Sequence, residues 1–250
     1  KSTGCGDEVL YYLAYEYEQS KDLVKAREIY YELVNDWKTS KYRPNAYLAF
    51  GELYFQEAQS DPSVWAAAEA AYDQVISAPP PENKVYGYAL YKLGYVYWNQ
   101  GEYEKSIDAF KKIIDYGTKF SQLPNASQLA TSARRDLIPV YALWGDPKKA
   151  YNFMKPLSGD VGGENDKTFK MMDELGVSYL DTGHYDEGIA LYGELMSRDK
   201  GSKWCEYHGH IAEATLAKKG GDKDAIVKVI SKQFAVHKEF TAGGASAEAK

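Results

Sequence analysis

The chain has 250 residues, a formal net charge of −6 and a hydrophobic fraction of 44%. This composition is ordinary for a folded protein and excludes wholesale disorder. A modestly acidic protein repels phosphate backbones, which argues against nucleic acid as a partner. The sequence contains no run of about 18 apolar residues, so no transmembrane segment is expected in this chain.

The first residues carry little targeting information. The sequence begins with Lys1 and shows no apolar signal core, so we expect a processed product or a fragment of a longer protein. Ser2 to Cys5 resembles a lipoprotein cleavage site without the apolar stretch that should precede it, which leaves open whether Cys5 is lipidated or free. Cys205 lies near the other end of the chain, and an extended helical array would keep the two thiols too far apart for a disulfide.

Tyrosine stands out among the residue types. It occurs 23 times, against 8 phenylalanines. Its ring supplies apolar area and its hydroxyl a polar tip, which suits surfaces that are partly core and partly contact face. The tyrosines recur at regular intervals, which indicates an internal repeat.

Pairs of amphipathic helices are predicted to follow one another along the chain. In each pair, a residue of the first helix faces a residue of the second helix at the crossing, and small side chains there let the two axes approach to about 8–10 Å. An aromatic or long apolar residue follows four positions later on the same face. In chain order, the crossing residues are Ala14 with Ala26, Gly51 with Ala68, Gly94 with Ser106, Ile138 with Ala150, Gly176 with Gly188, and Glu213 with Ala225.

The six pairs differ in how well they follow this pattern. The clearest runs from Tyr88 to Tyr116, and in it Tyr97 is expected to face the core and Gly101 to adopt the left-handed conformation at the turn. In the fourth pair, Ile138 is too large for a close crossing, so a weaker pair is expected. The sixth pair carries Glu213 at this position and is degenerate, as terminal repeats of solenoids commonly are.

This spacing resembles the tetratricopeptide repeat (TPR), whose signature has small residues at the eighth and twentieth positions and an aromatic residue at the twenty-fourth. The resemblance implies an all-α, TPR-like solenoid of about six helix pairs over residues 7–240, followed by a disordered tail over 241–250. Successive eighth positions lie farther apart than the usual TPR period of about 34 residues. We therefore expect long inter-repeat loops at 38–45, 61–65, 79–85, 118–127 and 159–167.

No constellation of residues predicts catalysis, a bound metal or a cofactor. Gly162–Thr168 resembles the end of a phosphate-binding loop, but Asp166 stands where a glycine is needed and would repel phosphate. Cys205, His208 and His210 are typical metal ligands, but they do not share one face of a helix. The carboxylates expected to be solvated on helix faces are Glu18, Glu52, Glu57 and Asp73.

The remaining candidate for function is the inner groove that the first helices line in TPR arrays. Here its amino-terminal half is aromatic and carries amides and carboxylates, and apolar patches with polar rims typically bind partners. The alternative is that these rings pack against neighbouring repeats. The predicted partner-binding residues are Tyr11, Tyr15, Phe55, Gln56, Tyr88, Tyr91, Tyr95, Trp98 and Asn99.

A narrower resemblance covers about residues 85–196. The stretches VYGYALYKLGYVYWNQGEYEKSIDAF, ATSARRDLIPVYALWGDPKKAYNFM and MMDELGVSYLDTGHYDEGIALYGELM are similar in pattern and order to the myxobacterial adventurous-gliding-motility TPR proteins. The resemblance implies a periplasmic or outer-membrane-associated component of a motility complex in the cell envelope. Its partners would be other envelope or motility proteins, or extended peptides.

Three functions therefore remain open. The first is a non-catalytic scaffold for protein–protein interaction, which a stable complex of fixed stoichiometry would favour. The second is a chaperone-like assembly factor that holds an extended client peptide in the aromatic groove, which transient binding to many unfolded segments would favour. The third is an enzyme or a subunit that positions one, which an activity lost with a single Asp, Glu or His would favour.

Overall fold

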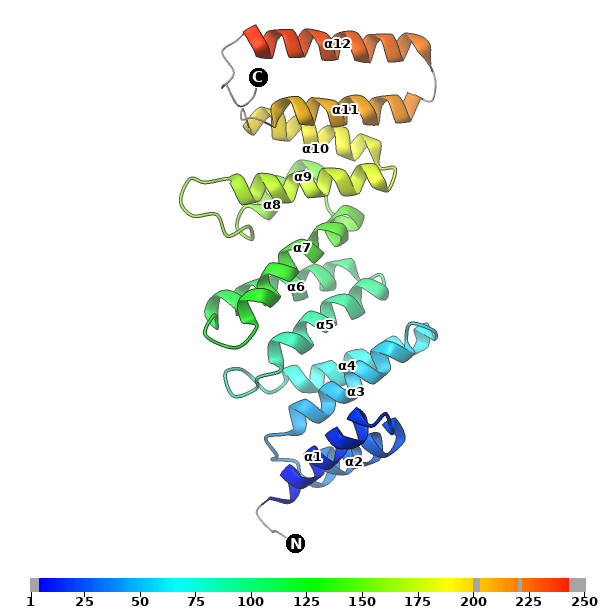
Figure 1. Ribbon diagram of the computed structural model, residues 1–250, viewed down its shortest axis with the longest axis vertical. Coiled ribbons are helices and arrows are strands. Elements are labelled where there is room, and N and C mark those ends of the chain that lie inside the picture. The colour runs from blue at the N-terminus through cyan, green and yellow to red at the C-terminus, as the bar shows by residue number, and fades with distance from the viewer. Residues whose placement is uncertain (1–4, 200–202, 220–221, 243–250) are drawn as a thin grey trace. The chain divides into compact units, whose positions relative to one another are not determined.

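The computed structural model describes residues 5–199, 203–219 and 222–242, and in these residues it contains helices and no strand (Figure 1). The predicted all-α fold of TPR-like helix pairs is confirmed. None of the described helices is both long and apolar enough to cross a membrane. The elements are α1 Gly6–Gln19, α2 Leu23–Asp36, α3 Arg43–Glu57, η1 Pro62–Val64, α4 Trp65–Ile76, α5 Tyr86–Asn99, α6 Tyr103–Lys119, α7 Ala126–Trp144, η2 Pro147–Lys149, α8 Ala150–Met154, α9 Asp166–Asp181, α10 Tyr185–Arg198, α11 Trp204–Lys219 and α12 Lys223–Ala242.

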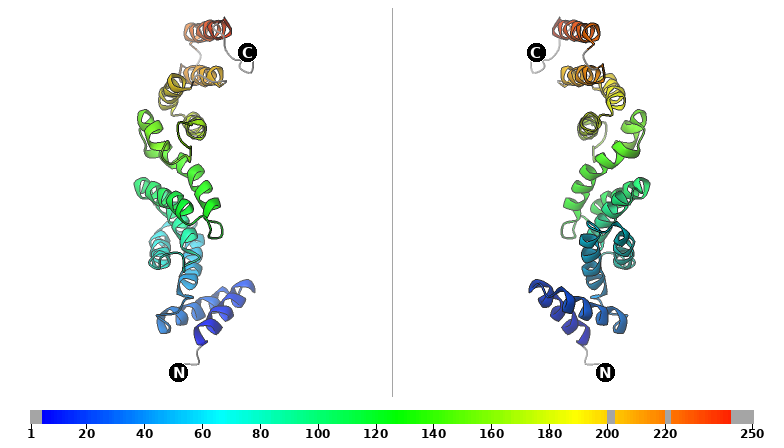
Figure 2. Two further views of the ribbon diagram at one scale, coloured as in Figure 1. Left: turned by 90° about the vertical axis from the view of Figure 1, so that its left-hand side faces the viewer. Right: turned by 90° about the vertical axis from the view of Figure 1, so that its right-hand side faces the viewer.

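The helices pack in sequence order within two compact units, residues 1–133 and 134–250. We call these the N-terminal unit and the C-terminal unit. In the N-terminal unit α1 packs on α2, α3 on α4 and α5 on α6, and α2 also contacts α3, as α4 contacts α5. In the C-terminal unit α9, α10, α11 and α12 follow the same order (Figure 2).

Glycines at the eighth position determine how closely the helices of a pair cross. A Cβ atom added to Gly51 would lie 2.5 Å from the Tyr72 ring, and one added to Gly94 would lie 2.8 Å from the Phe110 ring. Real Cβ atoms do not approach other atoms this closely, so a larger residue would push the helices apart. At the same crossing, the buried Ser106 hydroxyl donates to the Gly94 carbonyl oxygen over 2.7 Å. The predicted pairing of Gly94 with Ser106 is therefore confirmed.

Helix ends agree with the predicted turns at most junctions. Gly101 has a φ of +76°, the left-handed conformation expected after α5. Helix α3 begins at Arg43, earlier than predicted, because Pro44 lies in its first turn, where a missing amide hydrogen costs nothing. Most of the predicted tail, residues 243–250, lies outside the described residues, while Thr241 and Ala242 belong to α12.

The fourth pair is irregular. Ile138 is buried in α7, a helix of 19 residues that contains Pro139, while α8, which follows, has only five residues. The bulky Ile138 is consistent with the weaker pair that the sequence predicts.

Two details of the predicted register are wrong. In α11 the buried small residue is Ala214, whereas the Glu213 side chain is 76% exposed, because removing a charged carboxylate from water at a helix crossing is costly. Tyr97 was expected to face the core, but it is only half-buried at the edge of the α4–α5 core, with the Lys105 ammonium 5.3 Å from its ring centroid.

Candidate partner-binding site

The twenty-fourth residue of each regular pair extends past the small eighth residue and reaches the first helix. Its tip meets side chains at the fifth, ninth or twelfth position, which lie on one stripe of that helix. The Tyr30 hydroxyl donates to Glu18 over 3.0 Å, and the Tyr72 hydroxyl donates to Glu52 over 2.7 Å. We call the stripe in the N-terminal unit, together with the adjacent Tyr88, the aromatic face: Tyr11, Tyr15, Glu18, Glu52, Phe55, Tyr88, Tyr91, Tyr95 and Trp98.

Glu52 of α3 is the centre of a cluster that joins two successive first helices. Besides the Tyr72 hydroxyl, its carboxylate accepts the Tyr88 hydroxyl over 3.4 Å and pairs with the Lys92 ammonium over 3.0 Å. The same ammonium lies 4.2 Å from the Phe55 ring centroid and 5.6 Å from that of Tyr88. Aromatic faces attract a cation, so Lys92 is held by both charge and rings.

Burial raises the pKa values of the tyrosine hydroxyls in this cluster. Desolvation, together with the neighbouring Glu52 charge and hydrogen bond, raises the pKa of Tyr88 to about 12. The same causes raise the pKa of Tyr72 above its usual range. Both hydroxyls therefore remain protonated donors across the physiological pH range.

The third repeat differs because its twenty-fourth residue, Phe110, has no hydroxyl. Tyr91 and Tyr95 place their rings against Phe110, with centroid distances of 6.0 Å and 5.7 Å. Trp98 stacks on Tyr95 at 6.0 Å and is half-buried. Three consecutive turns of α5 thus present aromatic rings in edge and stacked contacts, which stabilise one another beyond their buried area.

The other predicted residues occupy varied environments. Tyr11 is half-buried and stacks on Tyr42 with centroids 4.7 Å apart, whereas Tyr15 is 42% exposed. The Asn99 side chain donates to the Tyr95 carbonyl oxygen one turn earlier, so it is bonded to its own helix. Gln56 is exposed and lines a cavity of about 70 Å³ between the first repeat and α3, together with Glu18 and Glu52.

The comparisons with known proteins support the repeat. Residues 88–116 match the family model of the tetratricopeptide repeat. This segment comprises most of α5 and α6, and therefore carries Tyr88, Tyr91, Tyr95 and Trp98 of the aromatic face. No curated protein matches the chain at a significant level.

Two solved structures are similar to the chain at low identity. One is a Podosopora anserina putative kinesin light chain with nearly identical TPR-like repeats, at 14% identity and a TM-score of 0.39, covering 80% of this chain and 98% of that one. The other is a point variant of the same protein, at 14% identity and a TM-score of 0.40, covering 80% and 97%. The TPR-like fold therefore rests on the helix pairs and on the matched repeat.

Two expectations about the carboxylates are wrong. Glu18 and Glu52 were expected to be solvated, but both accept tyrosine hydroxyls from the second helix of their own repeat. The sequence also did not identify Lys92 as part of the site. One feature of the sequence could have indicated it. Lys92 is at the sixth position of the third repeat, where the first two repeats have Tyr12 and Ala49.

The residues weighed as possible ligands are used in packing. His208 is buried with its ring against Trp204, and His210 stacks on Tyr192. Across residues 5–199, 203–219 and 222–242, no group of three or more His, Cys, Asp or Glu could hold a metal ion. Cys5 is exposed and forms no disulfide.

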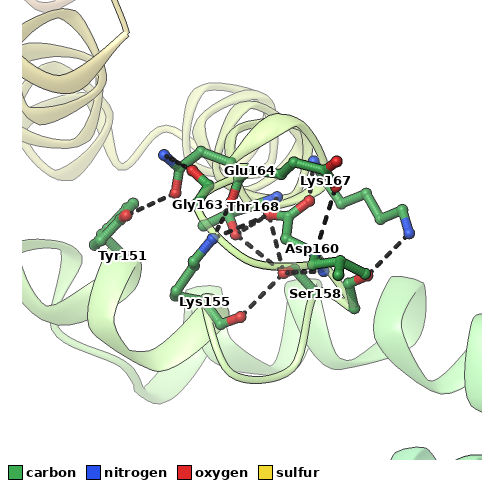
Figure 3. A network of polar contacts seen from close by, with 11 residues as sticks. Tyr151, Lys155, Ser158, Asp160, Gly163, Glu164, Lys167 and Thr168 are labelled. Atoms are coloured by element: carbon green, nitrogen blue, oxygen red, sulfur yellow. Dashed lines mark hydrogen bonds and ion pairs between the residues drawn. The ribbon is translucent and has the colours of Figure 1, made fainter.

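The segment that resembles a phosphate-binding loop holds a carboxylate instead (Figure 3). Asp160 accepts the backbone amides of Lys167 and Thr168 at the start of α9, each over 3.0 Å, and the Thr168 hydroxyl over 2.6 Å. Burial would raise the pKa of Asp160, but these hydrogen bonds and one from Ser158 outweigh it and hold the pKa at about 2. Asp160 therefore caps α9 where an anion would otherwise bind.

Proposed function

We propose that the protein is a non-catalytic scaffold that binds a protein or peptide segment along the aromatic face of its N-terminal unit. The observation that carries this proposal is the continuity of the face from α3 to α5. Tyr88 and Lys92 of α5 reach Glu52 and Phe55 of α3, so rings and polar groups of two repeats form one surface. TPR-type helix pairs serve protein–protein interaction, which agrees with the matched repeat.

The chemistry of the face supports this use. Tyr15 and Tyr88 are 42% and 38% exposed, while Trp98 and Phe55 are half-buried. Partly exposed aromatic rings lose little conformational entropy on binding and are common hot spots of interfaces. The carboxylates of Glu18 and Glu52 add polar groups that would favour donors on a partner.

A pair of matched substitutions tests the proposal. Tyr88→Ala and Trp98→Ala should each weaken partner binding by about tenfold or more, as the loss of an interface hot spot does. Tyr31→Ala is the control, because Tyr31 is 64% exposed on the second helix α2 and is not part of the aromatic face. Affinity purification followed by quantitative mass spectrometry measures retention, and thermal unfolding establishes that each variant is folded. If both aromatic-face variants fold and retain every partner that wild type retains, the binding surface lies elsewhere.

We further propose an envelope setting, from the resemblance to gliding-motility TPR proteins over about residues 85–196. In this setting the chain would be a periplasmic or outer-membrane-associated component of a motility complex, and its partners would be envelope proteins. Cell fractionation with a carboxyl-terminal tag tests the location, and recovery in the cytoplasmic fraction alone would refute it. A chaperone-like role would instead give transient capture of many unfolded segments on the same face, without fixed stoichiometry.

A further inference from the structure

Helix α1 exposes an apolar stripe. Val9, Tyr12 and Leu13 are 62%, 54% and 44% exposed, although each has a large apolar surface. Their spacing places them on one side of the helix. They occupy the third, sixth and seventh positions of the first repeat, away from Ala14, which faces α2.

The third and seventh positions are buried in the next two repeats. Ala46 and Phe50 of α3 belong to the core that α2 contributes to. Ala89 and Leu93 of α5 belong to the core formed with α4. A first helix therefore uses this stripe to pack on the helix pair before it, and in α1 the stripe is open among the described residues.

A second apolar surface lies between α11 and α12. Val227, Ile230 and Phe234 of α12 are 62%, 45% and 73% exposed. Ile230 and Phe234 also line a groove of about 330 Å³ with Ala212, Leu216, Val229 and His237. Such a groove suits the apolar side of an amphipathic helix.

The two surfaces carry opposite charge. Helix α1 holds Asp7, Glu8, Glu16 and Glu18 and has no lysine or arginine, while Lys41 from the loop before α3 lies close enough to Glu8 and Asp7 to interact with their charges. Helix α12 holds four lysines against Asp224 and Glu239. Lys228 and Lys232 line a second cavity, of about 220 Å³, beside the groove. Complementary charge of this kind steers two surfaces together.

We propose that α1 of one copy of this chain docks in the α11–α12 groove of a second copy. The apolar stripe of α1 fills the groove, and Glu16, which the helical spacing places on the same side as Val9 and Leu13, faces the lysines of α12. The contact joins two different surfaces, so copies associate head to tail, and unless the contacts close into a ring each added copy leaves one of each surface open.

The concentration dependence of the full chain tests the assembly. In analytical ultracentrifugation, the weight-average mass should rise with concentration and pass that of a dimer. Raising the salt concentration should weaken the assembly, because salt screens the charge pairing. A mass that stays at the monomer value at every concentration overturns the proposal.

Two single-surface variants test the polarity of the contact. Leu13→Asp and Phe234→Asp each place a carboxylate on one surface, and since both side chains are exposed, circular dichroism should show an unchanged fold. Each variant alone should be monomeric, and an equimolar mixture should form dimers and nothing larger. Val24→Asp, at a residue 70% exposed on α2, is the control and should assemble like wild type. A mixture that remains monomeric, or assembly lost with Phe234→Asp but not with Leu13→Asp, overturns the proposal.

Charge reversal tests the pairing itself. Glu16→Lys and Lys228→Glu should each raise the dissociation constant by about tenfold, and the double variant should recover most of the loss. A double variant that assembles no better than either single variant would show that α1 does not lie along α12.

Discussion

Tyrosine is divided unevenly between the two units, with 17 of the 23 in residues 1–133 and 6 in residues 134–250. The N-terminal unit is also the more regular, since its paired helices α1 to α6 have 12 to 17 residues each, whereas the C-terminal unit includes α8 with five. Regular pairs repeat the same stripe of positions on successive first helices. The surplus of tyrosine is therefore placed where the structure can form a continuous face.

The same type of contact nevertheless occurs within each unit. In the N-terminal unit Glu52 accepts the Tyr72 hydroxyl and pairs with Lys92 of the next first helix. In the C-terminal unit Asp173 accepts the Tyr192 hydroxyl over 3.3 Å and pairs with Lys203, directly before the next first helix, over 2.8 Å. A carboxylate clamp between successive repeats is therefore part of how the pairs pack. In the N-terminal unit the clamp lysine, Lys92, also lies against the rings of Phe55 and Tyr88, which belong to the proposed binding site.

The largest expected effect concerns the core of the best-formed repeat. Phe110 is fully buried and contacts Gly94, Tyr91 and Tyr95. Phe110→Ala should lower the free energy of unfolding by about 3–5 kcal/mol, because it leaves a cavity at the crossing. Urea denaturation measures the loss, and Tyr31→Ala on the exposed side of α2 should stay within about 0.5 kcal/mol of wild type. A loss below about 1 kcal/mol for Phe110→Ala would contradict the packing described here.

Glycine substitutions test whether the helices of a pair need a glycine at the eighth position in both units. Gly94→Leu in the N-terminal unit and Gly176→Leu in the C-terminal unit should each cost about 1–3 kcal/mol through overpacking. In both, an added Cβ would lie within 3.0 Å of a ring on the second helix. Gly193 of α10 meets nothing within 4 Å, so Gly193→Ala should stabilise the protein by up to about 1 kcal/mol. Equal unfolding midpoints for Gly94→Leu and wild type would refute the TPR register.

These crossings could be predicted from the sequence, because a glycine or serine at a helix crossing leaves a local and periodic signature. The clamp could not, since Glu52 and Lys92 lie 40 positions apart and their contact depends on the spacing between repeats. The sequence placed nine aromatic and amide residues on one stripe, but it did not show that Glu18 and Glu52 accept hydroxyls from the second helices. The contacts that were missed join separate elements, and no helical period encodes them.

A smaller effect is expected at the loop before α9, which has no counterpart in the N-terminal unit. Asp160→Asn should cost about 1–2 kcal/mol, because the start of α9 loses a charged acceptor. The pKa of Asp160 is held at about 2, below its ordinary value of 3.8. Since the folded pKa is the lower one, the carboxylate stabilises the fold above about pH 4, and this contribution is lost as the pH falls towards 2. Thermal unfolding from pH 6 to pH 2 should show a shallower acid loss for Asp160→Asn, and parallel curves would exclude this role.

The smallest expected effect concerns the coupling energies of the ion pairs in the two clamps. The Lys92 side chain is 18% exposed beneath the rings of Phe55 and Tyr88, whereas the Lys203 side chain is 48% exposed. Ion pairs strengthen when water is excluded, and exposed pairs contribute about 0–1 kcal/mol. Double-mutant cycles of Lys92→Met with Glu52→Gln, and of Lys203→Met with Asp173→Asn, measure the two coupling energies. The first should be about 1 kcal/mol and depend weakly on salt, and the second should be about half of that or less and fall as salt is added. Equal coupling energies with equal salt dependence would mean that the rings around Lys92 do not strengthen its ion pair with Glu52. Partner binding would then be the remaining role of the rings of Phe55 and Tyr88.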